Sequence, residues 1–158
     1  IVETPELEAW YLGESPAHSP EVKHRLTVLL EELKPDAIVF EQAYLYLGMR
    51  KLLEELHLTT PLIYSSHNLE ADMMKEIFTS QSKEIEFSAQ LKELETSEKQ
   101  LAKSAIGIIA VSENDAQIFQ SWGAENVLVQ GNGTSPLTHS LVKRLRVRRI
   151  MKKLNIIN

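Results

Sequence analysis

The sequence lacks the residues and runs that mark several common classes of protein. It contains no cysteine, which excludes disulfides, thiolate metal sites and a cysteine nucleophile. No apolar run approaches the roughly 18 residues that a transmembrane helix needs, and no secretory signal pattern is present. A Gly-x-Gly-x-x-Gly fingerprint and a phosphate-loop lysine motif are also absent, which leaves a dinucleotide or ATP site poorly supported. These absences favour a cytoplasmic protein with no cofactor held by this chain.

The histidines give no sign of a metal site. Four of them are scattered along the chain without the spacing of a ligand set: His18, His24, His57 and His139. We therefore expect no bound metal and interpret these four as surface residues.

Charge is divided unevenly along the chain. Residues 1–133 hold all 22 acidic residues and ten of the 17 basic ones, a net charge of −12. Such an acidic body argues against nucleic acid as a partner. Residues 134–158, called the basic tail below, hold the other seven basic residues and no acidic one.

Apolar residues of the basic tail recur at a spacing typical of an amphipathic helix over residues 141–154: Leu141, Leu145, Ile150 and Leu154. We expect a linker helix whose leucines dock on a domain. The alternative is a surface helix that contacts anionic lipid or phosphate, which would place the protein at the periphery of a membrane.

Short apolar runs alternate with helical patterns in the body. Four runs without polar alternation indicate strands buried on both faces: residues 37–40, 62–65, 106–111 and 127–129. Leucines and other apolar residues at helical spacing predict helices over residues 21–33, 43–56 and 83–103. Ser112 is expected to cap a further helix that reaches Trp122 and ends at Gly123.

This alternation is typical of right-handed βαβ units. We therefore predict an α/β fold with a Rossmann-like, mostly parallel sheet flanked by helices. Residues 1–20 would form a lead-in loop, residues 21–133 the Rossmann-like domain, and residues 134–158 the basic linker helix.

Polar residues follow each predicted strand, where open parallel sheets bind their ligands. Glu41 follows the first strand and Ser112 the third. After the second strand come the candidates His67, Asn68 and Glu70. After the fourth comes a loop that contains Asn132 and Gly133, where glycine lets backbone amides approach a ligand. These residues are the predicted substrate-binding set.

His67 is the candidate catalytic residue. A histidine in this loop could bind or deprotonate a hydroxyl group at neutral pH. The alternative is structural: the imidazole caps the next helix or bonds a backbone carbonyl. Glu70 has a similar pair of interpretations, because it could orient His67 or simply favour a helix N-terminus.

Four segments, in order, resemble the large family of retaining glycosyltransferases with the two-domain GT-B architecture. They are Lys34-Pro35-Asp36-Ala37-Ile38-Val39, Ser66-His67-Asn68-Leu69-Glu70, Ala110-Val111-Ser112-Glu113-Asn114-Asp115 and Val127-Leu128-Val129-Gln130-Gly131-Asn132-Gly133. Glu98 also stands near a position where members carry a glutamate. The chain departs from the family at Gln130, where proline is usual, and it lacks the glycine-rich first loop.

The resemblance implies the N-terminal, acceptor-side half of a GT-B fold. The full-length enzyme would move a sugar from a nucleotide-sugar donor to a hydroxyl of a sugar, lipid or glycan acceptor, with His67 on the acceptor side. The C-terminal donor domain, with its paired glutamates, is not present in these residues. Because the chain begins with Ile1, we expect a processed chain or a segment of a longer protein, inactive by itself.

Two other functions fit the same sequence. The chain could be a stand-alone α/β binding or regulatory module whose basic tail docks on a partner or an anionic surface. A third option is another enzyme built on the two-domain plan, such as a sugar-nucleotide epimerase, which would need no hydroxyl acceptor.

Overall fold

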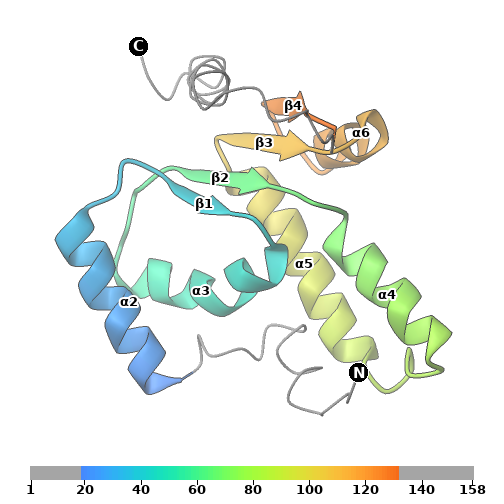
Figure 1. The fold of residues 1–158 in the computed structure, drawn as a ribbon. Coiled ribbons are helices and arrows are strands. Elements are labelled where there is room, and N and C mark those ends of the chain that lie inside the picture. Colours follow the sequence, from blue (N-terminus) through green and yellow to red (C-terminus); the bar gives the residue numbers. More distant parts are fainter. Residues whose placement is uncertain (1–18, 132–158) are drawn as a thin grey trace, which may run out of the picture.

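The computed structural model describes residues 19–131, which fold as an α/β domain around a four-stranded, all-parallel sheet (Figure 1). The lead-in residues 1–18 and the segment 132–158, with the basic tail, lie outside the described part. Helices and strands alternate in the order α2 (Pro20–Leu33), β1 (Ile38–Phe40), α3 (Ala43–Glu55), β2 (Leu62–Ser65), α4 (Glu70–Ser80), α5 (Ser88–Ser104), β3 (Gly107–Ala110), α6 (Glu113–Ser121) and β4 (Val127–Val129).

The sheet keeps the order of the sequence, β1-β2-β3-β4, and every neighbouring pair is parallel. All four predicted apolar runs form strands, so the expected parallel, Rossmann-like architecture is confirmed. In register, Phe40 pairs with Tyr64, and Tyr64 with Ile108. Because all the strands point the same way, the loops that follow them lie along one edge of the sheet.

The core described by these residues lies on one face of the sheet. Alternate strand residues enter it, among them Phe40, Tyr64 and Ile108. All five described helices supply buried residues to the same cluster: Leu30, Ala43, Tyr44, Leu53, Ala71, Met74, Phe78, Leu91, Leu94, Leu101, Ala102, Ala116 and Phe119. This one-sided cover follows from topology, because right-handed crossovers that all advance in one direction put their helices on the same side. Figure 1 shows α2, α3, α4 and α5 gathered on that side.

Local signals mark the end of α2 and both ends of α6, as the sequence predicts. The chain leaves α2 at Lys34, which has a φ of 42° and precedes Pro35, a residue that cannot continue the helix. At the other end of the domain, Ser112 caps α6 by accepting a hydrogen bond from the amide of Asp115 at 3.1 Å. Gly123 then ends the helical segment with a φ of 101°, which favours glycine because it has no Cβ.

The region between β2 and β3 differs from the sequence prediction. No range was predicted for its first helix, α4, although a helix start near Glu70 was one interpretation of that residue, and α5 begins at Ser88 rather than at residue 83. Residues 81–87 instead form turns, and Phe87 stacks on Phe78 with a ring separation of 4.6 Å. No side chain next to the start of α4 caps it, so of the local signals for a helix N-terminus only the acidic residues of the first turn, Glu70 and Asp72, are present.

None of the helices within residues 19–131 combines the length and the apolar character that crossing a bilayer requires.

Candidate functional site

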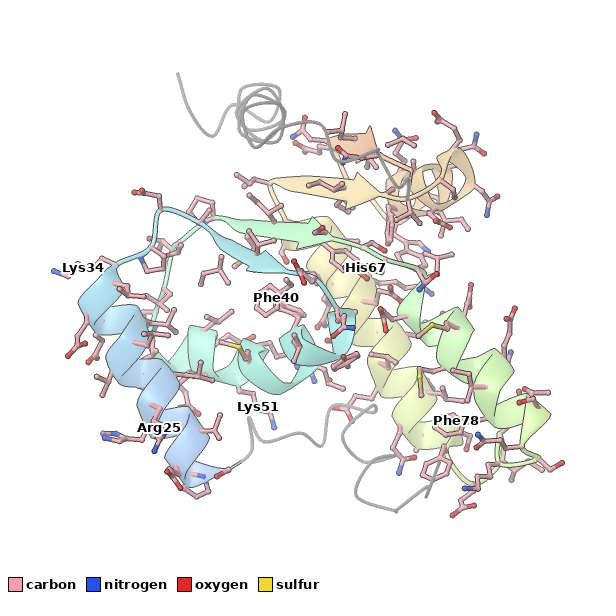
Figure 2. The ribbon with its side chains drawn as sticks, viewed as in Figure 1. Arg25, Lys34, Phe40, Lys51, His67 and Phe78 are labelled. Carbon is pink, nitrogen blue, oxygen red and sulfur yellow. The ribbon has the colours of Figure 1, made fainter. Side chains whose placement is uncertain are left out.

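The candidate site lies at the end of β2, an inner strand of the sheet. The loop from Ser66 to Leu69 connects β2 directly to α4. Figure 2 shows His67 in this loop, beyond the end of β2 and next to the start of α4. His67 and Asn68 are both exposed, whereas Ser66 and Glu70 on either side are 3% and 2% exposed. The loop is therefore buried at Ser66 and Glu70, and between them it exposes the imidazole of His67 and the amide of Asn68 to solvent.

One carboxylate, that of Glu98 in α5, holds both ends of this loop. Its Oε1 accepts a hydrogen bond from the Tyr64 hydroxyl in β2 at 2.8 Å and one from the backbone amide of Glu70 at 2.9 Å. Its Oε2 accepts a bond from the backbone amide of Ala71 at 3.1 Å. Those two amides are the first donors of α4, which have no partner within their own helix. Glu98 thus supplies the cap that the local sequence of α4 lacks.

The interior of the loop is fixed by Ser66. Its backbone amide donates to the carbonyl of Ile109 in β3 at 2.9 Å, which extends the sheet pairing past β2. Its hydroxyl donates to the carbonyl of Asn68 at 2.6 Å and closes a tight turn around His67. The Asn68 amide nitrogen contacts the Met73 sulfur at 3.6 Å. These bonds hold the backbone on both sides of His67, whose side chain is exposed.

Glu70 and Glu98 form a buried acidic pair beneath the loop. Burial raises the pKa of Glu70 from 4.5 to about 7, and the negative charge of Glu98 adds to the effect. Burial also raises the pKa of Glu98, although the amides of Ala71 and Glu70 and the Tyr64 hydroxyl oppose that rise. The pKa of Tyr64 lies well above its ordinary value because of burial and the charge of Glu98. Two carboxylates this close cannot both ionise easily, so the pair retains a proton near neutral pH.

The protonation of Glu70 is linked to folding. Because its folded pKa exceeds its unfolded value, the folded state binds the proton more tightly. The resulting stability is fully present below the unfolded pKa, near 4.5, and is lost as the pH rises through about 7. Its Oε2 atom is buried without a hydrogen-bond partner among the described residues. A neutral carboxyl group tolerates that position much better than a carboxylate does.

The other predicted site residues have different positions. Glu41 is exposed directly after β1, on the same edge of the sheet as His67. Ser112, after β3, is half-buried and already serves as the cap of α6. Glu70 lies in the interior, not on the surface of the loop. Asn132 and Gly133 lie outside the described residues. Within residues 19–131, no three or more acidic or histidine side chains gather as metal ligands would.

Sequence reasoning left Glu98 and Tyr64 out of the candidate set, although both are central to the geometry. A signal for Glu98 does exist in the sequence. It lies four residues after Leu94 and three before Leu101, on the same stripe of α5, and both leucines are 0% exposed. A charge on such an apolar stripe must find partners in the core, because an unpaired buried charge is costly. Tyr64 carried no comparable signal, since tyrosine is common in buried strands.

No protein family, no curated protein and no solved structure matches the chain.

Proposed function

We propose that this chain is the acceptor-side domain of a glycosyltransferase that moves a sugar from a nucleotide-sugar donor to a hydroxyl group. The observation that supports it most directly is the exposed His67 in a loop anchored at both ends by Glu98. In this role His67 accepts the proton of the attacking hydroxyl group. The donor-binding domain and the nucleotide sugar lie outside these 158 residues.

Neighbouring groups would bind the acceptor. Glu41 and Asn68 are exposed on the same edge of the sheet as His67, and carboxylate and amide groups are suited to hydrogen bonding with sugar hydroxyls. Ser112 keeps a hydroxyl proton free to donate, because its oxygen accepts the bond from the amide of Asp115. Glu70 acts from the interior: its backbone amide, bound to the Glu98 carboxylate, begins α4 and sets where the loop ends. In the same proposal, Asn132 and Gly133, which lie outside the described residues, also bind the acceptor.

The proposal is tested by replacing His67 in the enzyme that carries this chain together with its donor domain. His67→Ala should lower turnover about 10²–10⁴-fold, the usual contribution of a general base. The unfolding midpoint should not change, because the His67 side chain is exposed. His24→Ala is the matched control, since His24 is exposed on α2 and should be replaceable without effect. Unchanged turnover of His67→Ala would refute the assignment.

The separate chain should not transfer sugar, because half of a two-domain cleft cannot preorganise a transition state. The sequence that encodes the flanking regions gives a further check. A following α/β domain with paired glutamates would support the transferase.

The uneven charge favours one other candidate, a binding module that docks through its basic tail. Seven bases with no acid in residues 134–158 would attach it to an anionic partner. Binding through that segment should then weaken steeply with salt, and His67→Ala should leave it unchanged.

A further inference from the structure

One face of the sheet is apolar but receives no helix from the described core. Strand residues alternate between the two faces, and those opposite the core are Val39, Ile63, Ile109 and Leu128. None of these four belongs to the core cluster or to the side chains packed against it. They are called the second face below.

The second face is continuous across all four strands. Val39 pairs with Ile63 in register, and Ile109 pairs with Leu128. The exposure of the second face is uneven: Val39 is 53% exposed and Ile109 and Leu128 are half-buried, whereas Ile63 is 6% exposed although it lies outside the core cluster. Gly107, beside Ile63, adds no side chain, and a glycine within a strand often marks the close approach of another segment. Parallel sheets are almost always covered on both faces, so this face requires a covering element.

We propose that the basic tail of this same chain covers the second face, with the apolar side of residues 141–154 packed on Val39, Ile63, Ile109 and Leu128. The tail has the required chemistry. Basic residues fill most of the positions around a stripe of four apolar residues, which are related by three- and four-residue steps as on one side of a helix: Val147, Ile150, Met151 and Leu154. The proposal stands apart from the chemistry of His67.

Charge favours this occupant. Residues 19–131 contain ten basic and 18 acidic residues, a net charge of −8, whereas the tail carries +7. Docking of the tail would nearly neutralise the domain. At physiological salt such attraction acts over about 8 Å, so it orients the tail as it approaches and adds to the apolar contact.

The connection is long enough. Nine residues lie between Gly131, just after β4, and Leu141, and the ten steps from one to the other can span up to about 33 Å. The outer strands of a four-stranded sheet are only about 15 Å apart. Because the tail is tethered, it meets the second face at a high effective concentration, which a separate partner would have to match.

Paramagnetic relaxation tests this contact in the full 158-residue chain. Since the chain has no cysteine, Ser140→Cys gives a single site for a nitroxide label beside the apolar segment. The Ile, Leu and Val methyl groups of the same chain are isotope-labelled and observed by NMR. If the tail docks, the nitroxide should reduce the intensity of the methyl signals of the second face. The signal of Ile85, which is 91% exposed in the turn between α4 and α5, should keep its intensity. No loss at the second face overturns the proposal.

Variants separate apolar docking from charge alone. Ile150→Lys removes one apolar contact from that stripe while keeping the tail basic, and should weaken the intensity loss. Arg146→Lys is the matched control and should preserve it. Salt at about 1 M, where screening shortens to about 3 Å, should weaken but not abolish the effect.

Two mixing experiments exclude the other occupants. In the first, one sample of the chain carries the nitroxide at residue 140 but no isotope. It is mixed with a second sample that has no nitroxide and carries isotope-labelled methyl groups. Intensity loss in that mixture would assign the second face to another copy and overturn the proposal. Phosphatidylglycerol vesicles are then added. If the methyl signals of the second face regain their intensity as the chain binds the vesicles, the tail belongs to lipid and the proposal is overturned. If the intensity loss within one chain persists, docking on the second face is supported.

Discussion

Removing the Glu98 carboxylate should destabilise the protein by about 2–4 kcal/mol. Glu98→Ala leaves three donors without their acceptor: the amides of Glu70 and Ala71 and the hydroxyl of Tyr64. A buried donor left unpaired costs about 1–3 kcal/mol, which sets the gross loss at about 3 kcal/mol or more. Part of this is offset, because the variant no longer has to bury an acidic group whose pKa burial raises.

Two further variants test whether that loss comes from the hydrogen bonds. Glu98→Gln keeps one acceptor oxygen and should lose only about 1–2 kcal/mol. Glu95→Ala is the control on the same helix, because Glu95 is exposed and pairs with Lys99 one turn away. An exposed pair of this kind contributes little, so the control should stay within about 0.5 kcal/mol of the unmodified chain.

Urea denaturation of the three variants gives the free energies of unfolding, and native-state hydrogen exchange locates the effect. The amides of Glu70 and Ala71 should exchange faster in Glu98→Ala, while amides in the middle of α6 should change only as far as global stability falls. A loss below about 1 kcal/mol for Glu98→Ala, or equal losses for Glu98→Ala and Glu95→Ala, would refute the assignment of Glu98 as the cap of α4.

Two more predictions concern single side chains. Glu70→Gln should remove a pH dependence: from pH 4.5 to above 7 the unmodified chain should lose up to about 3 kcal/mol of stability as Glu70 ionises, while the variant stays nearly level over that interval. Parallel pH profiles of the unfolding free energy would disprove this linkage. Ser112→Ala should cost about 1 kcal/mol through loss of the α6 cap, with Ser121→Ala near the other end of the helix as the control. Equal denaturation midpoints for Ser112→Ala and the unmodified chain would contradict the cap.

Much of the architecture could be predicted from local pattern. Apolar runs without polar alternation predicted the four strands, and helical spacing of leucines between them predicted parallel pairing through crossovers. Ser112 and Gly123 marked the ends of α6 because a cap and a left-handed turn depend on one or two neighbouring residues. The position of His67 just after β2 followed from the same local signals.

What only the tertiary structure decided depends on contacts between distant residues. Glu98 caps a helix that begins 28 residues earlier, so no capping residue next to α4 marks its start. The pKa of Glu70 depends on burial and on that same distant carboxylate, neither of which its neighbours in sequence reveal. The apolar run of each strand predicted burial on two faces, but the sequence could not say which residues meet the described helices. The strand order β1-β2-β3-β4 decided that, because successive right-handed crossovers in one direction place every connecting helix on one side.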